Sequence, residues 1–243
     1  MDVLRNPVYS YLLGKQPFYY RIFKTLFFYY SKVVFSTYAP LNVHGRENIP
    51  NSPFIFCSNH NSHMDVAILA VSANRDFNNF GMLAARDYWF DSLIRRKVVN
   101  TIMNLIPVDR KSDNNKKLSI EDSQALCNAF MNYNNRSLVL FPEGTRGKAG
   151  EILPFKSGAA RFSISLDRPI VPAVIYGSHK IWPRGKIFFG PPTKMNVYIL
   201  EPIYPKTFLK GDKHSEKELA VAVKKMTSAL EEKIKQKAVS VYG

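Results

Sequence analysis

Cysteine is nearly absent from this sequence: its 243 residues include only Cys57 and Cys127. Two thiols supply neither a disulfide framework nor a paired C-x-x-C site, and such usage is typical of a reduced, cytosolic setting. Cys57 stands in the apolar run "FIFCS", where a thiol is usually a small buried hydrophobic group and its thiolate is disfavoured. A cysteine nucleophile beside the nearby His60 is therefore a minor interpretation.

Acidic residues are also scarce, with 19 Asp and Glu against 34 Lys and Arg, which gives a formal net charge of +15. This excess favours an anionic partner: nucleic acid, a negative membrane surface or anionic metabolites. The basic residues are spread along the chain without an RRM, helix-turn-helix or zinc-finger pattern, so we expect no nucleic-acid partner. A non-catalytic basic protein that binds anionic membranes remains an alternative to an enzyme.

The absence of other sequence patterns narrows the possible classes of protein. The chain has no G-x-S-x-G sequence, which excludes the common serine hydrolase. It has no internal repeat, and its first residues lack the pattern of a signal peptide. Hydrophobic residues make up 46% and charged residues 22%, values typical of a folded chain of one large domain or two small ones.

Residues 1–39 form a basic, aromatic leader. The charges of its stretch "FYYRIFKTLFFYYSKVVFSTYA" are Arg21, Lys24 and Lys32, which a helix gathers into an arc of roughly 80°. Its ~22 residues nearly reach the length that crosses a bilayer, yet each cation near the membrane centre costs roughly 2.5–3.5 kcal/mol. We therefore expect an amphipathic helix that lies in the membrane interface with its cations at the headgroups. A core helix packed on the body of the protein is the alternative.

From residue 40 onward, short apolar runs alternate with amphipathic stretches, which indicates an α/β domain over residues 40–243. Strands are expected at residues 53–58, 80–85, 136–141, 170–176 and 195–200, and helices at residues 63–73, 87–103, 117–133, 156–166 and 215–238.

The stretch "CSNHNSHMDVAI" (57–68) brings together two histidines, two asparagines and an aspartate after an apolar run. Ser62 and Asp65 fit the S-x-x-D start of a helix, which leaves His60 unexplained. If the helix begins near Ser62, Asp65 can reach back to the imidazole, fix its tautomer and support its protonated form. A metal site is less well supported, because H-x-x-H-x-D is not a standard zinc spacing.

A second candidate motif, "FPEGTRG" (141–147), combines turn residues with a glutamate and an arginine. Gly144 and Gly147 let the backbone approach a ligand, and the guanidinium fork of Arg146 suits phosphate. Glu143 can hydrogen-bond a hydroxyl or hold Arg146, and an ordinary turn with a surface ion pair is the alternative.

Two more cations are candidates for an anionic ligand. Arg110 closes the apolar run "LIPVDR" and opens a basic loop whose lysines we interpret as solvated. Lys156 stands in the first turn of an expected helix, where a helix N-terminus and a cation together suit phosphate.

The motifs "NHNSHMD" (59–65), "IPVDR" (106–110) and "FPEGTRG" (141–147), followed by "IVPAVI" (170–175), resemble the four blocks of the glycerolipid acyltransferases. The most similar subgroup is the 1-acylglycerol-3-phosphate acyltransferases. The resemblance implies a single α/β acyltransferase domain with a largely buried mixed sheet flanked by helices, preceded by an amphipathic helical membrane-contact element.

The resemblance also implies a role for each matching residue. His60 would be the general base and Asp65 its partner, and "IVPAVI" would shape the acyl-binding region. Neither a metal nor another cofactor would be used. The residues that would bind the acceptor, with Lys156 added as a phosphate candidate, are Arg110, Glu143, Gly144, Thr145, Arg146 and Lys156.

The implied reaction transfers a fatty acyl group from acyl-CoA or acyl carrier protein to the free hydroxyl of 1-acylglycerol-3-phosphate, giving phosphatidic acid in phospholipid biosynthesis. Backbone N–H groups near Ser62 are candidate donors to the oxyanion. The expected partners are an anionic membrane surface, a lysophospholipid and the thioester donor, and the expected location is monotopic on the cytoplasmic face of the membrane. A different lysophospholipid or a lyso-aminolipid remains an alternative acceptor.

Two residues depart from the family's pattern. Asn104 stands where the family usually has glycine, and we expect its tolerance of left-handed geometry to preserve the turn. His63 occupies a position that is often a bulky aromatic, so a second imidazole competes with His60 for the role of base. The H-x-x-x-x-D spacing selects His60.

Overall fold

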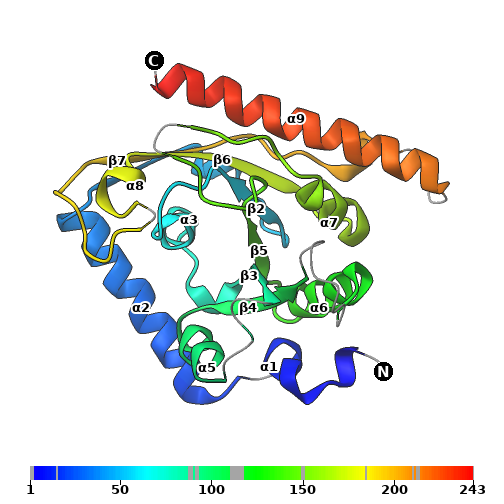
Figure 1. Ribbon diagram of the computed structural model, residues 1–243, viewed down its shortest axis with the longest axis horizontal. Helices are drawn as coiled ribbons and strands as arrows, with labels where there is room; N and C mark the ends of the chain where they lie inside the picture. The colour runs from blue at the N-terminus through cyan, green and yellow to red at the C-terminus, as the bar shows by residue number, and fades with distance from the viewer. Residues whose placement is uncertain are drawn as a thin grey trace. The chain divides into compact units, whose positions relative to one another are not determined.

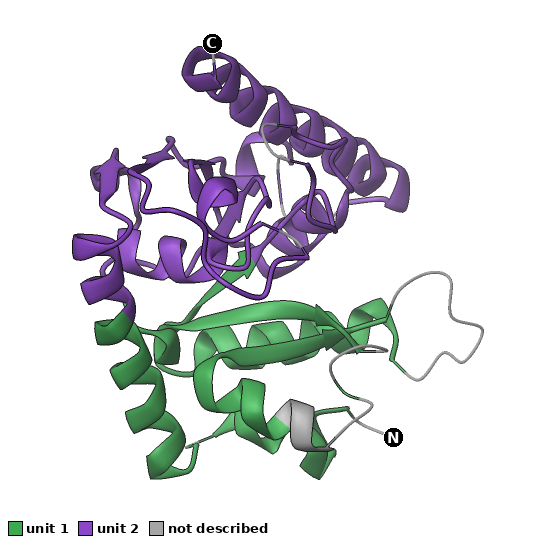
Figure 2. Ribbon diagram, turned by 60° about the vertical axis from the view of Figure 1, so that its left-hand side comes forward, with its two compact units in different colours: residues 1–30, 75–139 green, residues 31–74, 140–243 purple. Residues whose placement is uncertain are grey.

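The computed structural model describes residues 3–14, 16–86, 90, 93–109, 118–148, 151–183, 185–209, 211 and 214–242. The chain divides into two compact units, one of residues 1–30 and 75–139 and the other of residues 31–74 and 140–243 (Figure 2). The division predicted from the sequence, 1–39 and 40–243, stays a prediction.

The unit of residues 31–74 and 140–243 contains a mixed arrangement of strands (Figure 1). They lie in the order β1 (Leu41–His44), β7 (Met195–Ile199), β6 (Ile170–Tyr176) and β2 (Ile55–Ser58). β1 is parallel to β7 and β2 is parallel to β6, whereas β6 and β7 are antiparallel. All of β2 and six of the seven residues of β6 are buried, which explains their continuous apolar runs.

The helices of this unit are α3 (Asp65–Ser72), α7 (Gly158–Leu166), α8 (Ser178–Ile181) and α9 (Glu216–Tyr242), with short 3-10 turns η3 (Arg46–Asn48) and η5 (Pro205–Thr207). α9 packs against β6 and α7. Its buried side chains recur at every fourth position, so they form one stripe along the helix. These side chains are Ala222, Met226, Leu230, Ile234 and Ala238.

The unit of residues 1–30 and 75–139 contains parallel strands in the order β5 (Ser137–Leu140, whose last residue belongs to the other unit), β3 (Phe80–Ala85) and β4 (Asn104–Val108). Its helices are α1 (Ser10–Leu13), α5 (Leu93–Ile102) and α6 (Ile120–Asn132), with 3-10 turns η1 (Val3–Arg5), η2 (Pro7–Tyr9) and η4 (Phe77–Asn79). A capping box between Ser119 and Asp122 begins α6.

Most of the predicted elements are confirmed. The strands predicted at residues 80–85 and 170–176 have the observed bounds of β3 and β6. For the other three predicted strands, both ends lie within two residues of the observed ends of β2, β5 and β7. β1 and β4 were not predicted. Each is short, and an apolar run of this length does not by itself distinguish strand from helix or loop. β4 also contains Pro107, which an edge strand tolerates because, among the described strands, one side of its backbone has no partner.

α2 (Phe18–Thr37) confirms the predicted leader helix, but one of its cations faces the protein. Lys24 is fully buried, and its Nζ donates to Gln16 Oε1 at 2.5 Å. Burial lowers the pKa of Lys24 from 10.5 to about 7. The prediction that Lys24 lies at the headgroups is therefore wrong, whereas Arg21 and Lys32 are exposed.

Asn104 explains how this inward lysine is accommodated. Its side-chain amide donates to the carbonyls of Phe77 and Phe80, and its Oδ1 accepts from Gln16 Nε2. Asn104 is not among the residues with positive φ, so the expected left-handed geometry is wrong. The asparagine instead joins β4 to the buried polar chain of Gln16 and Lys24.

The outward face of α2 is apolar and exposed, and the helix has an exposed large hydrophobic residue in each turn. These residues are Phe18, Tyr19, Ile22, Phe23, Leu26, Tyr29, Tyr30 and Val33. In the part of the chain that the structure describes, no helix is both long enough and apolar enough to cross a membrane.

Candidate active site

The carboxylate of Asp65, the first residue of α3, organises the turn between β2 and that helix. The Asp65 side chain is fully buried and accepts four hydrogen bonds. Oδ2 accepts from His60 Nδ1 at 2.9 Å and from the backbone N–H groups of Asn61 and Ser62, each at 2.8 Å. Oδ1 accepts from Ser178 Oγ at 2.8 Å. The predicted hydrogen bond between Asp65 and His60 is therefore present.

This hydrogen bond determines how His60 presents its ring. A carboxylate only accepts, so Nδ1 of His60 carries the proton and Nε2 of the neutral ring keeps its lone pair. The side chain is 20% exposed, and Nε2 has no hydrogen-bond partner among the described residues. Phe141 stacks on the imidazole with 3.8 Å between ring centroids and 10° between planes. The ring is thus held in position, and its basic nitrogen is left without a partner among the described residues.

The loop that follows β5 holds the backbone of His60 from both sides. The N–H of His60 donates to Glu143 Oε1 at 2.8 Å, and the C=O of His60 accepts from the N–H of Gly147 at 2.9 Å. Glu143 Oε2 accepts from the N–H of Leu153 at 2.8 Å. Burial raises the pKa of Glu143, and the two amide hydrogen bonds oppose that rise. Glu143 therefore positions the histidine and its loop.

Both glycines of this loop are required by its geometry. Gly144 has a φ of +70°, and a Cβ there would lie 2.7 Å from Lys156 Nζ. At Gly147 a Cβ would lie 3.1 Å from the Glu151 carbonyl oxygen and 3.3 Å from Glu143 Oε2. The first position favours glycine because of its backbone angle and the second because of close approach.

The second imidazole, His63, belongs to a different set of contacts. Arg146 Nη1 lies 2.5 Å from His63 Nδ1 and 2.7 Å from Nε2, and the ring of Trp182 lies 5.0 Å away between centroids. Burial, Arg146 and His60 all lower the pKa of His63. The carboxylate of Asp65 hydrogen-bonds His60, so the geometry favours His60 over His63 as the base.

The backbone N–H groups at the start of α3 are already in use. Those of Asn61 and Ser62 donate to Asp65, that of His63 donates to the Trp182 carbonyl, and that of Met64 donates to Ser62 Oγ at 3.2 Å. These four N–H groups are therefore not free to bind an oxyanion in this arrangement, and for the following N–H groups of the first turn of α3 the expectation stays a prediction. Ser62 also departs from a full capping box, because its Oγ accepts from Met64 rather than from Asp65.

Several residues of the site were missed or left unexplained by the sequence. Asn59 is fully buried, with Oδ1 accepting from the N–H of Ile175 and Nδ2 donating to the Ile175 carbonyl. The hydroxyl of Tyr242 donates to the same carbonyl at 3.0 Å. Ser178 follows the "IVPAVI" block and Tyr242 has no motif around it, so only the fold reveals their contacts.

Sequence comparison decides the family. A family model described as "Acyltransferase" matches residues 40–176, more than half of the chain. The chain belongs to the acyltransferase family. The 1-acyl-sn-glycerol-3-phosphate acyltransferase of Limnanthes douglasii is 29% identical to it over 164 residues, which are 68% of this acyltransferase and 54% of the relative. The enzyme of the same name from Saccharomyces cerevisiae is 28% identical over 208 residues, 79% of this chain and 60% of the relative.

This acyltransferase thus spans a little over half the length of these curated relatives. Its fold is also similar to a crystal structure of the 1-acyl-sn-glycerophosphate (LPA) acyltransferase PlsC from Thermotoga maritima. The TM-score is 0.65 at 22% identity, and the match covers 92% of this chain and 81% of PlsC.

The other candidate residues indicated by the sequence of this acyltransferase differ in whether the structure describes them and in where it places them. Arg110 lies outside the described residues. Thr145 is exposed on the loop, and the Lys156 side chain lies against Gly144. Cys57 is buried in β2, and burial raises the pKa of its thiol, which opposes a role as nucleophile. Among the described residues, no three His, Cys, Asp or Glu side chains are grouped to hold a metal ion.

Proposed function

We propose that this protein transfers a fatty acyl group from an acyl thioester to the free hydroxyl of 1-acylglycerol-3-phosphate, giving phosphatidic acid. The observation that carries the proposal is the arrangement of His60, whose Nδ1 donates to Asp65 and whose side chain is 20% exposed. The names of the relatives from Limnanthes douglasii and Saccharomyces cerevisiae support the choice of acceptor.

In the proposed reaction, Nε2 of His60 takes the proton of the acceptor hydroxyl as its oxygen attacks the thioester carbonyl carbon. The tetrahedral intermediate then collapses, the carbon–sulfur bond breaks, and the leaving thiolate takes the proton from the imidazolium. Asp65 keeps the ring in the correct tautomer and stabilises its charge. A general base of this kind contributes about 10²–10⁴-fold to the rate.

The acceptor's phosphate is the natural partner for the cations near this loop. We propose Arg146 and Lys156, which lie on and beside the "FPEGTRG" loop, together with Arg110 as its ligands. Gly144 and Thr145 would line the same side, whereas Glu143 acts by holding His60. Both candidate donors, acyl-CoA and acyl carrier protein, are anionic and suit the net charge of +15. That the reaction needs no metal or other cofactor stays a prediction.

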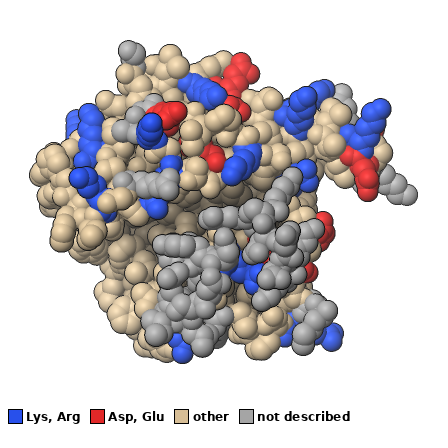
Figure 3. Space-filling model, viewed as in Figure 1, with Lys and Arg blue, Asp and Glu red and all other residues tan. Residues whose placement is uncertain are grey.

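We also propose that the protein rests on one leaflet of an anionic membrane, on the cytoplasmic face. The exposed apolar face of α2 supports this location, as does a second exposed tip at Ile187 and Phe188, which are 81% and 82% exposed. Phe189 beside this tip packs on Tyr38 just after α2, with 6.0 Å between ring centroids. Basic side chains outnumber acidic ones on the face seen in Figure 3, which suits anionic lipid.

The decisive assay measures transfer of a labelled oleoyl group from oleoyl-CoA, and in parallel from oleoyl-acyl carrier protein, to 1-acylglycerol-3-phosphate in mixed micelles. Wild type should form phosphatidic acid, and His60→Ala should be slower by about 10²–10⁴-fold. His63→Ala is the matched control, because the His63 imidazole lies against Arg146, whereas His60 is the histidine that donates to Asp65.

Two results would overturn these assignments. Equal rates for wild type and His60→Ala would remove His60 as the base. No product from either donor would remove the proposed acceptor, and other lysophospholipids would then be tested in the same micelles.

Membrane contact is tested by sedimentation with vesicles that contain phosphatidylglycerol. Leu26→Ser and Phe188→Ser should weaken binding, because each removes an exposed apolar side chain from the proposed contact. Val239→Ser on α9 is the control, since Val239 is also strongly exposed but lies outside the proposed contact. Equal binding by all three variants and wild type would contradict the proposed surface.

A further inference from the structure

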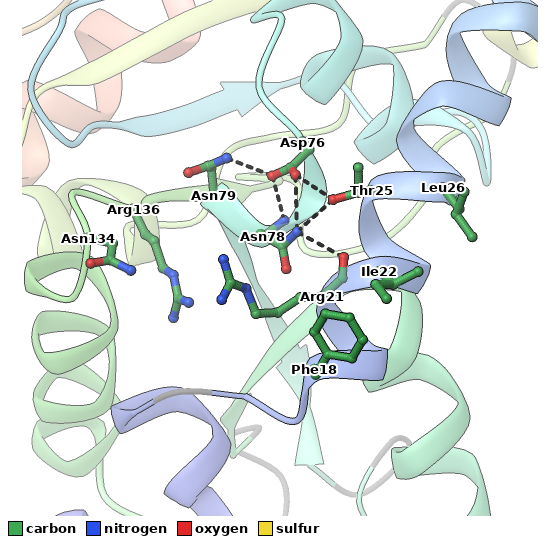
Figure 4. A pocket seen from close by; sticks show the side chains of 10 residues that line it. All are labelled: Phe18, Arg21, Ile22, Thr25, Leu26, Asp76, Asn78, Asn79, Asn134 and Arg136. Atoms are coloured by element: carbon green, nitrogen blue, oxygen red, sulfur yellow. Dashed lines mark hydrogen bonds between the residues drawn. The ribbon is translucent and has the colours of Figure 1, made fainter.

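A cavity of about 480 Å³ lies within the unit of residues 1–30 and 75–139. Its walls come from α2, from the η4 turn before β3, and from the loop between α6 and β5 (Figure 4). All ten lining residues belong to this one unit, and none of them takes part in the proposed acyl transfer. The cavity therefore needs an explanation of its own.

Two arginines face this cavity, and neither forms an ion pair with a described carboxylate. In Figure 4 the guanidinium groups of Arg21 and Arg136 point toward one another across it. Arg136 is only 6% exposed, and its Nη1 is buried without a hydrogen-bond partner. A buried guanidinium nitrogen without a partner is unfavourable, and an anionic ligand would relieve it.

The surroundings hold Arg136 in this position. Its guanidinium carbon lies 4.9 Å from the ring centroid of Phe130 and 4.7 Å from that of Tyr133. Burial lowers the pKa of Arg136, and the positive charge of Arg21 lowers it further. The positive charges of Arg21 and Arg136 therefore repel each other across the cavity.

The carboxylate that lines the cavity, Asp76, is occupied by neutral donors. Oδ2 accepts from Thr25 Oγ1 at 2.9 Å and from Asn78 Nδ2 at 3.0 Å. Oδ1 accepts from the N–H of Asn78 at 3.1 Å and from Asn79 Nδ2 at 2.6 Å. With one carboxylate against two guanidiniums, the lining of the cavity carries an excess of positive charge.

One wall of the cavity is apolar and exposed. It consists of Phe18, Ile22 and Leu26, which lie on successive turns of α2 and are 76%, 40% and 58% exposed. A ligand that fits both the arginines and the apolar wall has an anionic group that binds the former and hydrocarbon that packs on the latter. Inorganic phosphate satisfies the first requirement only.

We propose that this cavity is a second lipid site, which binds the phosphate group of an anionic glycerophospholipid between Arg21 and Arg136. The acyl chains then lie along Phe18, Ile22 and Leu26. Two guanidinium groups suit a phosphate because each can donate paired hydrogen bonds to its oxygens. The site stands whether or not the protein acylates 1-acylglycerol-3-phosphate.

Native mass spectrometry of the full chain released from detergent tests this site by counting bound lipids. The probe is dioctanoyl phosphatidylglycerol, which carries an anionic phosphate and is neither acceptor nor product of the proposed reaction. Dioctanoyl phosphatidylcholine has the same chains with a zwitterionic headgroup, and inorganic phosphate supplies the anion without chains. Wild type should bind one phosphatidylglycerol about tenfold more tightly than either comparison ligand.

The variants distinguish the cavity from general attraction to a basic protein. Arg21→Gln and Arg136→Gln should each weaken phosphatidylglycerol binding about tenfold through loss of charge-assisted hydrogen bonds. Lys32→Gln removes the same charge from an exposed position on the same helix and should bind as wild type does. Arg21 is exposed, so its variant remains informative if Arg136→Gln does not fold.

Three outcomes would overturn the proposal. Unchanged binding by Arg21→Gln would remove the arginines as ligands. An equal loss in Lys32→Gln would assign the binding to net charge, and equal affinity for inorganic phosphate and phosphatidylglycerol would remove the role of the apolar wall.

Discussion

Lys24 provides a quantitative test of how α2 sits on the protein. The Lys24 side chain is fully buried, and its pKa is lowered from 10.5 to about 7. Between these two values the unfolded chain binds a proton that the folded chain releases, so the free energy of unfolding rises with pH. The slope reaches at most about 1.36 kcal/mol per pH unit. From pH 7 to pH 9 this single group should therefore add about 2 kcal/mol of stability.

The substitution Lys24→Met removes the titrating group and should remove this rise. Urea unfolding followed by circular dichroism at pH 7, 8 and 9 gives the free energy of unfolding for wild type and variant. Their difference, rather than either value alone, isolates Lys24 from the other groups that titrate. The loss of the hydrogen bond to Gln16 shifts the variant by an amount that does not depend on pH, so only the slope matters.

Lys32→Met is the matched control, because Lys32 is an exposed lysine on the same helix. It should leave the pH dependence of wild type unchanged. A constant difference between wild type and Lys24→Met over pH 7–9 would refute the reasoning and place a charged, solvated Lys24 on the outer face of α2.

Three further predictions concern the site. Asp65→Asn should lower kcat about 10²–10⁴-fold with little change in KM, measured by acyl transfer in micelles, because the amide no longer fixes the tautomer of His60. Glu143→Gln should destabilise the fold by about 1–3 kcal/mol in urea unfolding, since one of two backbone N–H groups loses its acceptor. Gly144→Ala should lower the free energy of unfolding by about 1–3 kcal/mol, because a φ of +70° is strained for a residue with a Cβ.

The sequence allowed the hydrogen bond between His60 and Asp65 to be predicted because both residues lie in one short turn. The backbone hydrogen bonds around the site could not be predicted in this way. Glu143 was expected to bind substrate, yet its carboxylate accepts from the amides of His60 and Leu153. A motif indicates which side chain is present but not which distant backbone group it meets.

The leader helix also shows that contacts with distant residues cannot be predicted from a local sequence pattern. Hydrophobic periodicity predicted the helix within about two residues, and helical spacing placed its cations on one face. Hydrophobic periodicity cannot distinguish a solvent-exposed cation from a buried cation that hydrogen-bonds a side-chain amide. The burial of Lys24 depends on Gln16 and Asn104, which come from different parts of the chain.

The last turn of α9 carries a consequence for how the site responds to heat. Tyr242 lies in that turn, and its hydroxyl donates to Ile175 and accepts from Asn59, the residue that precedes His60. Helix ends fray at a lower free energy than the core unfolds. Fraying there would remove one hydrogen bond from Asn59, the neighbour of the proposed base, while the rest of α9 stays packed. Activity should then decline on warming before circular dichroism records any loss of helix.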